Sequence, residues 1–179
     1  MTKPGATVSR ADTQSKQYSS VSRRAEALAA RLETGAALLA KVAESLTEAE
    51  WKTRVKDGRT VGVIVHHVAS MYPLEMDLAR TIASGKPVEG VTWDVIAEVN
   101  ARHAKEYAAV GKAEALEALR LNSGMAAAGI RQFSDEELDT AAAFSLNSDA
   151  PLTTQFVLED HPVRHSWHHL ARIRDAIKR

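Results

Sequence analysis

The chain has 179 residues, and its 23 Lys and Arg residues balance 23 Asp and Glu residues, so the formal net charge is zero. The length suits one domain with a sizeable core, and a neutral chain without a basic stripe argues against nucleic-acid binding. Cysteine is absent, which excludes disulfides, thiolate nucleophiles and cysteine zinc sites and leaves His, Asp and Glu as candidate metal ligands.

The first 20 residues are polar and mixed, which predicts a flexible N-terminal tail ahead of a single domain at 21–179. This stretch lacks the apolar core that is typical of a secretory signal. No apolar run elsewhere approaches the roughly 18 residues needed to span a bilayer. We therefore expect a cytoplasmic protein without a membrane partner.

Apolar residues recur at helical spacing through the rest of the chain. The long predicted helices cover 22–46, 61–84, 93–110 and 113–133, and a last helix begins at 153 or 154. No strand pattern is longer than a few residues. The predicted fold class is therefore all-α, a four-helix bundle with one or two short extra helices.

Capping residues mark the starts of several of these helices. A serine, Ser20 or Ser22, is the predicted N-cap of the first helix, and Thr60 is that of the second. Short helical turns are expected after Thr47 and after Ser134, and the segment that follows, 141–151, is interpreted as a loop.

The last helix carries a dense histidine cluster. His161, His165 and His169 are spaced by four residues, so helical geometry stacks them on one face. His165 and His169 lie beyond Pro162, where the helix is expected to run without interruption, and two imidazoles one turn apart can hold one metal ion. A solvated basic face would give the same pattern. Two histidines alone make a poor site, so a metal centre needs a third ligand from elsewhere.

A further histidine stands in an apolar stripe of the second helix. The members of the stripe, three or four residues apart, are Ile64, His67, Met71, Leu74 and Leu78. His67 is therefore expected to point into the bundle, and His66, rotated by about 100°, toward the edge of that face. The alternative for His67 is a core histidine bonded to a carbonyl or a carboxylate. If the two helices are neighbours, three neutral imidazoles can meet on one ion and leave a position open for water or substrate.

Two segments together resemble a known family. The first is Thr60-Val-Gly-Val-Ile-Val-His-His67-Val-Ala69, and the second is His165-Ser-Trp-His-His169-Leu-Ala-Arg-Ile-Arg174. They resemble the DinB-like superfamily, which includes YfiT-like metal-dependent hydrolases and mycothiol-dependent maleylpyruvate isomerases. The resemblance covers roughly 22–178.

The resemblance implies a four-helix bundle that binds a divalent metal, often zinc or nickel, and is frequently a homodimer. Matched residue by residue, it assigns His67, His165 and His169 as the ligands. His161 and His168 compete with the chosen pair for the register of the last helix. The implied activities are thiol S-transfer or isomerisation with mycothiol or bacillithiol, and hydrolysis, each acting on a small-molecule substrate.

Charged residues near the cluster have two interpretations each. Glu159 and Asp160 either accept a hydrogen bond from a ligand imidazole or favour the helix's N-terminal end. Arg164 and Arg172 either bind an anionic substrate or, as we favour for at least one of them, are solvated or paired with a surface acid.

The function therefore has three candidate classes. The first is a metal-dependent transferase, isomerase or hydrolase, with Asn100 or Arg172 orienting an anionic substrate. The second is a non-enzymatic bundle that stores or senses metal or acts in a stress response. The third is a plain interaction domain with a solvated histidine face. Asn100 and His103 are either substrate contacts or, as we favour, satisfied groups at a bundle end.

Overall fold

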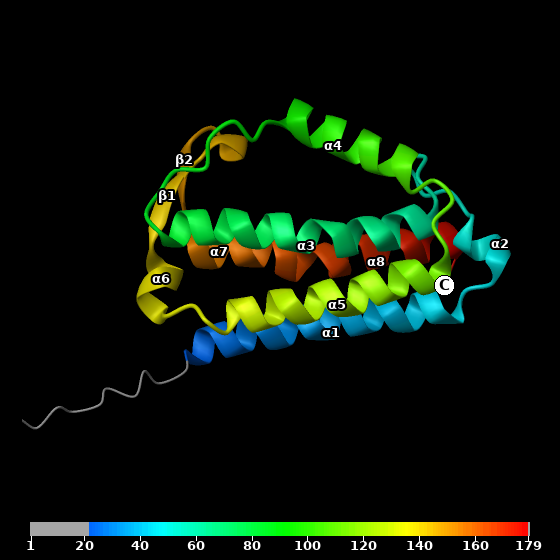
Figure 1. Cartoon of the computed structure of the whole chain (residues 1–179), viewed down its shortest axis with the longest axis horizontal. Helices are drawn as coiled ribbons and strands as arrows, with labels where there is room; N and C mark the ends of the chain where they lie inside the picture. Colours follow the sequence, from blue (N-terminus) through cyan, green and yellow to red (C-terminus); the bar gives the residue numbers. More distant parts are fainter. Residues whose placement is uncertain (1–21, 179) are drawn as a thin grey trace, which may run out of the picture.

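Four helical rods pack into a bundle in the computed structural model, which describes residues 22–178 (Figure 1). The predicted tail at 1–20 lies outside the described residues. The first three rods are α1 (Arg23–Ser45), α3 (Val61–Ala83) and α5 (Lys112–Ile130). The fourth combines α7 (Thr154–Leu158), η2 (Glu159–Val163) and α8 (Arg164–Ile177). α5 and α8 each pack against both α1 and α3, which closes the bundle.

The predicted N-caps are confirmed for three of the rods. The hydroxyl of Ser22 accepts a hydrogen bond from the N–H of Ala25, and that of Thr60 accepts one from Val63. Thr153 caps α7 in the same way. Each cap satisfies one of the N–H groups that the first turn of a helix leaves free.

Two further short helices lie where short helical turns were expected, and each begins with a capping box. These are α2 (Glu48–Trp51), capped by Thr47, and α6 (Asp135–Asp139), capped by Ser134. α2 carries the buried Trp51.

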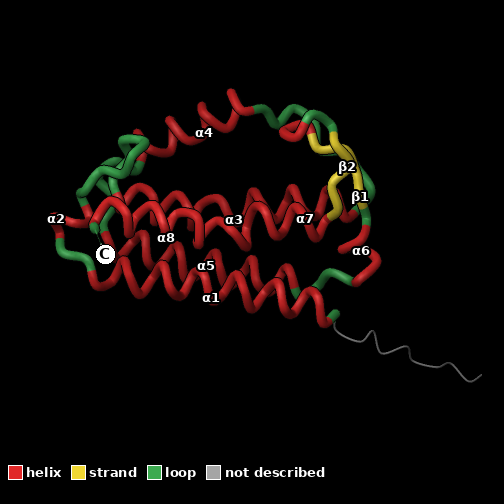
Figure 2. Tube along the Cα trace, turned by 180° about the vertical axis from the view of Figure 1, so that it is seen from behind, coloured by secondary structure: helices red, strands yellow, loops and turns green. Residues whose placement is uncertain are grey.

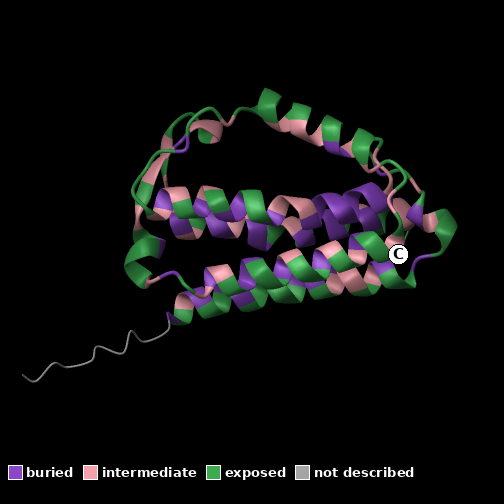
Figure 3. Ribbon diagram, viewed as in Figure 1, coloured by how far each residue is buried: buried purple, intermediate pink, exposed green. Residues whose placement is uncertain are grey.

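The core lies between the four rods (Figure 3). Its largest fully buried side chains are Tyr72, Phe144, Leu32, Leu39, Ile64, Ile82, Leu119, Ile130, Leu138, Leu158, Leu170 and Ile173. The apolar stripe predicted for the second helix is only partly core. Leu74 is 43% exposed and Met71 and Leu78 are half-buried, because this side of α3 faces a cleft and not another rod of the bundle.

Pro73 lies inside α3 without ending it. Proline has no N–H, so the carbonyl of Ala69, one turn earlier, loses its helical donor. The side-chain amide of Asn122 on α5 donates to that carbonyl at 2.9 Å. The neighbouring helix therefore satisfies the acceptor that Pro73 leaves free, and also ties α5 to α3.

α4 (Trp93–Glu106) lies outside the bundle and runs above α3 as a largely exposed helix (Figures 1 and 3). It ends at Glu106, earlier than the predicted 110, with Tyr107 as its C-cap. Gly111, the residue after the predicted end, is the N-cap of α5. α4 is thus a strap over the bundle, joined to it at each end.

The predicted loop at 141–151 contains a small hairpin (Figure 2). β1 (Ala141–Phe144) pairs antiparallel with β2 (Ala150–Thr153), and the short turn η1 (Ser145–Asn147) stands between them. An alanine-rich strand has neither the β-branched residues nor the alternation that mark a strand in sequence. Backbone hydrogen bonds join Val88 to Ala143 and Ser145, so the hairpin holds the segment that leads into α4.

The last rod contains one wider helical turn. Glu159–Val163 form a π-helical turn that contains Pro162, whereas the sequence suggested a regular helix here. The wide turn changes the helical phase between His161 and His165. No helix among residues 22–178 has the length and apolar character needed to cross a membrane.

Candidate functional site

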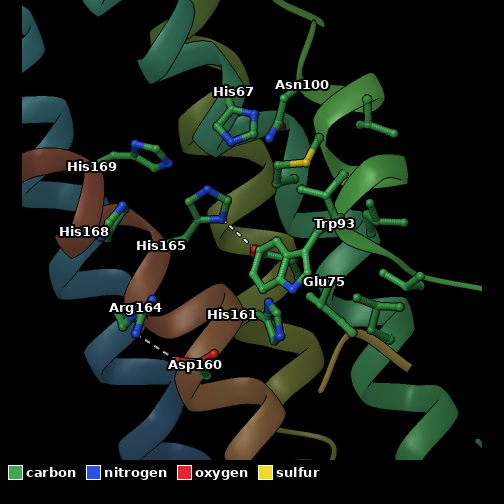
Figure 4. A pocket seen from close by; sticks show the side chains of 17 residues that line it. His67, Glu75, Trp93, Asn100, Asp160, His161, Arg164, His165, His168 and His169 are labelled. Atoms are coloured by element: carbon green, nitrogen blue, oxygen red, sulfur yellow. Dashed lines mark hydrogen bonds and ion pairs between the residues drawn. The ribbon is translucent and has the colours of Figure 1, made fainter. Parts of the chain in front are cut away.

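The side chains of His67, His165 and His169 converge between α3 and α8 (Figure 4). The ring centroids are 5.1 Å apart for His67 and His165, 5.3 Å for His67 and His169, and 4.9 Å for His165 and His169. Each ring offers one nitrogen such that all three nitrogens lie within 4.8 Å of one another. The structure therefore brings together the three histidines that the sequence singled out.

A hydrogen bond next to the triad fixes α3 and α8 against each other. The hydroxyl groups of Tyr72 on α3 and Ser166 on α8 share a buried hydrogen bond of 2.6 Å. Leu170 and Ile173 of α8 are buried in the core. These contacts set the rotation of α8, so that His165 and His169 face α3.

A carboxylate that the sequence analysis missed supports the triad. Oε1 of Glu75 lies 2.6 Å from Nδ1 of His165, and both side chains are largely buried. The carboxylate can accept the Nδ1 proton, which leaves the lone pair of Nε2 directed away from Glu75. Glu75 follows His67 by eight residues, which is two helical turns plus about 80°. Its signal in the sequence is an acid among the apolar residues of the helix that carries His67.

Burial keeps the other two imidazoles of the triad neutral. Desolvation, with a smaller contribution from His165, lowers the pKa of His67 to about 2. The same two causes lower the pKa of His169 far below its ordinary value. Nδ1 of each of these rings is buried and has no hydrogen-bond partner among the described residues.

A second buried histidine pair lies beside the triad. Nδ1 of His66 is 2.9 Å from Nε2 of His103 on α4, and the ring of Tyr107 stacks on His66 with centroids 3.8 Å apart. His66 was expected toward the edge of its face, yet it is 7% exposed, because the end of α4 covers it. Burial, followed by the nearby His66, lowers the pKa of His103 to about 4. His103 is thus a buried residue that joins α4 to α3.

The two remaining histidines of the cluster are not among the three whose nitrogens converge. His161 stacks on Phe144 of the hairpin with centroids 5.6 Å apart. His168 is exposed on α8, and its ring lies edge-on to His169 with centroids 5.0 Å apart. Both rings line the cleft described below. The π-helical turn explains why His161 leaves the line of His165 and His169.

The acidic and basic residues near the cluster form ion pairs. Glu159 pairs with Arg31 at 2.7 Å and Asp160 with Arg164 at 2.9 Å, so neither carboxylate supports a triad imidazole. Arg172 pairs with Asp57 at 2.9 Å, as favoured from the sequence.

A cleft of about 240 Å³ opens beside the triad, between α3, α4 and the start of α8. His67, His165 and His169 line its polar end together with Glu75 and Asn100. Asn100 projects from α4 beside His67 (Figure 4). The preferred sequence interpretation of Asn100 as a bundle-end group is therefore replaced by a position on the cleft wall.

Solved structures share this fold. YfiT from Bacillus subtilis, described as a probable metal-dependent hydrolase with an unusual four-helix bundle topology, is 21% identical with a TM-score of 0.64, covering 89% of this chain and 87% of its own. The colibactin self-resistance protein ClbS, solved in complex with double-stranded DNA, is 19% identical with a TM-score of 0.67 over 86% and 95% of the two chains. DfsB, described as a sibling lethal factor precursor, is 21% identical with a TM-score of 0.69 over 88% and 96%.

At these identities the likeness shows the fold alone, and no curated protein sequence matches this chain. The sequence itself matches a family model, that of the DinB superfamily, over residues 31–173. The match runs from α1 into α8 and includes all three triad histidines. The chain therefore belongs to the DinB superfamily.

Proposed function

We propose that this protein binds one divalent metal ion through His67, His165 and His169 and acts on a small molecule held in the adjoining cleft. The observation that carries the proposal is the convergence of three imidazoles from two helices, with ligand nitrogens within 4.8 Å of one another. Three protein ligands leave coordination positions for water or substrate, the arrangement of catalytic zinc sites.

The residues fit such an ion chemically. A ligating imidazole must be neutral, and burial lowers the pKa of both His67 and His169. Their buried Nδ1 atoms lack a partner in the described part of the chain, which is costly unless something else binds there. Glu75 supports the third imidazole in the manner of the carboxylate–histidine pairs found at metal centres.

The set of ligands narrows the choice of metal. Imidazole suits zinc, nickel, copper and iron, whereas magnesium and calcium prefer oxygen ligands. We favour zinc or nickel, as the family resemblance implies. A bound ion of this kind would supply a Lewis acid and lower the pKa of a bound water or thiol.

An open coordination position is compatible with several reaction classes. YfiT is described as a probable metal-dependent hydrolase, and hydrolysis is the first activity that we propose here. Thiol S-transfer or isomerisation with mycothiol or bacillithiol is the second.

We also propose that the protein is a cytoplasmic homodimer. The neutral net charge favours a small-molecule substrate over the nucleic acid seen with ClbS.

The cleft separates this proposal from metal storage or sensing. A storage site needs no access for a second molecule, whereas here the three histidines line a cleft of about 240 Å³. Cofactor and substrate sites are concave and mostly apolar with a few convergent polar groups, and this cleft has that character.

Metal analysis of purified protein tests the proposal. Wild type should contain close to one equivalent of metal per chain after incubation with zinc and removal of the excess, and a His67→Ala/His169→Ala double variant should contain almost none. His168→Ala, which changes the exposed neighbour of His169, is the matched control and should retain the metal. Equal and near-zero metal in wild type and the double variant would overturn the proposal.

A further inference from the structure

The cleft beside the triad has two chemically different ends. Its polar end is formed by the triad, Glu75 and Asn100. Away from the triad, apolar side chains from three parts of the chain line it: Met71, Leu74 and Leu78 of α3, Val91, Trp93, Ile96 and Val99 in and before α4, and Leu146 of η1. Asp160, His161 and Arg164 line its third side, from η2 and the start of α8. Any molecule that fills the cleft therefore meets the triad at one end and, along the rest, apolar side chains from α3 and α4 and polar side chains from η2 and α8.

The two helices that form the apolar walls run antiparallel. α3 ends at Ala83, the chain turns along the hairpin, and α4 then returns so that His103 meets His66 near the triad. On α3 the path from His67 to Leu78 takes about three helical turns, roughly 16 Å at the α-helical rise. The apolar part of the cleft is consequently long and follows α3.

The cleft is also narrow for its length. Pockets for drug-sized ligands measure about 300–1,000 Å³, and this one is about 240 Å³. A volume this small along a path this long fits a slender molecule better than a bulky one.

The apolar wall is exposed to solvent in the protein itself. Leu74 is 43% exposed, and Trp93, the first residue of α4, is 70% exposed. The end of α4 that carries Trp93 follows the segment bound to the hairpin, while His103 and Tyr107 fix the opposite end against His66 of α3. Exposed apolar surface beside a polar constellation is a frequent mark of a ligand site.

We propose that the cleft binds an elongated small molecule with a metal-seeking polar head at the triad and an unbranched apolar tail, such as an acyl chain, between α3 and α4. The identity of the head rests on the proposed function, whereas that of the tail rests on the cleft walls alone. Trp93 covers the tail at the mouth of the cleft, and Leu74 contacts it from α3.

A homologous series of n-alkyl hydroxamates tests both parts separately. Binding of the two-, six- and eight-carbon members to zinc-loaded and to metal-free protein is measured by calorimetry, with competition against the longest member where binding is weak. Burial of each methylene should raise the affinity about threefold to fourfold, so that the eight-carbon compound binds about tenfold tighter than the six-carbon one. The same gain in affinity per methylene is expected for the metal-free protein, because removing zinc does not change the apolar walls of the cleft.

Matched substitutions locate the tail. Leu74→Gln and Trp93→Gln alter exposed side chains of the cleft and should each weaken the eight-carbon compound about tenfold while leaving the two-carbon compound unchanged. Val95→Gln is the control, because Val95 is 42% exposed on the same helix as Trp93 but does not line the cleft. Circular dichroism and a thermal scan of each variant establish that it is folded.

The outcomes distinguish the two proposals. An affinity that does not rise with chain length in either form of the protein overturns the tail, as does an equal loss in Val95→Gln and Leu74→Gln. An affinity that rises with chain length but does not depend on zinc supports the tail and contradicts the metal-dependent function.

Discussion

Nδ1 of His165 on α8 lies 2.6 Å from Oε1 of Glu75 on α3, so a hydrogen bond within the site joins the two helices that build the triad. The bond fixes the plane of the imidazole and selects the nitrogen that remains free to bind a metal. Glu75 is 7% exposed and its second oxygen, Oε2, has no partner among the described residues. The carboxylate is thus placed for one partner, the triad histidine.

Glu75→Gln should therefore weaken metal binding about 10- to 100-fold without removing a ligand. The amide is a poorer acceptor than a carboxylate, and its NH₂ group can present a donor to Nδ1. A zinc dissociation constant measured against a competing chelator checks this. Glu44→Gln, an exposed substitution on α1, is the control and should match wild type. Unchanged affinity in Glu75→Gln would show that the carboxylate has no part in the site.

His67→Ala and His66→Ala should separate the two adjacent histidines of α3. We expect His67→Ala to reduce metal affinity by more than 100-fold, since it removes one of three ligands. His66→Ala should leave metal affinity nearly unchanged but lower the free energy of unfolding by about 1–3 kcal/mol, because it leaves the buried His103 without its partner. Metal titration and urea unfolding of both variants decide the matter. Loss of metal in His66→Ala alone would reverse the assignment.

Asn122→Leu should destabilise the protein by about 1–3 kcal/mol, because the carbonyl of Ala69 loses the side-chain donor that replaces the N–H missing at Pro73. Pro73→Ala restores a backbone N–H one turn after Ala69, so the same change in that background should cost much less. Denaturant unfolding of the four proteins forms a double-mutant cycle. Additive effects would contradict the role assigned to Asn122.

Stability of the metal-free protein should fall as the pH drops below about 6.5. The pKa of His103 is lowered to about 4 in the folded state and that of His67 to about 2, so the unfolded chain binds protons first as the pH falls. Stability is fully present above the unfolded pKa of about 6.5 and declines by up to about 1.4 kcal/mol per pH unit for each such group.

Urea unfolding between pH 7.5 and 5 measures this decline. Above pH 5 carboxylates contribute little, so histidines dominate the slope. His103→Gln should give a shallower slope than wild type, whatever its absolute stability. A stability that stays constant from pH 7.5 to 5 would show that these histidines are accessible to protons in the folded protein.

Two helical glycines should respond oppositely to alanine. A Cβ at Gly62 would lie 2.5 Å from Nε1 of the buried Trp51, whereas a Cβ at Gly124 would meet nothing within 4 Å. Gly62→Ala should destabilise by about 1–3 kcal/mol through overpacking. Gly124→Ala should stabilise by about 0.5–1 kcal/mol through helix propensity. Thermal unfolding compares them, and equal effects would rule out close packing of Trp51 on Gly62.

The sequence alone determined the helix starts and the shared face of two ligand histidines. Helix caps and spacing depend on neighbouring residues, so Ser22 and Thr60 marked the starts of α1 and α3 correctly. The four-residue spacing of His165 and His169 placed them on one face of α8, because helical geometry is set within a single turn.

Only the tertiary structure decided what each face meets. His66 and His67 are both buried, and the difference between them is that His67 faces the histidines of α8, whereas His66 bonds His103 of α4. Glu75 acquires its role because His165 arrives from a rod some 90 residues later in the chain. The cleft exists because α4 spans the bundle without packing into it. The alanine-rich hairpin that holds the segment before α4 has no periodicity that would predict it from the sequence. Contacts such as Glu75 with His165 and His66 with His103 join segments that are distant in the sequence. Hydrophobic periodicity predicts whether a side chain is buried, but it does not predict which residues bury it.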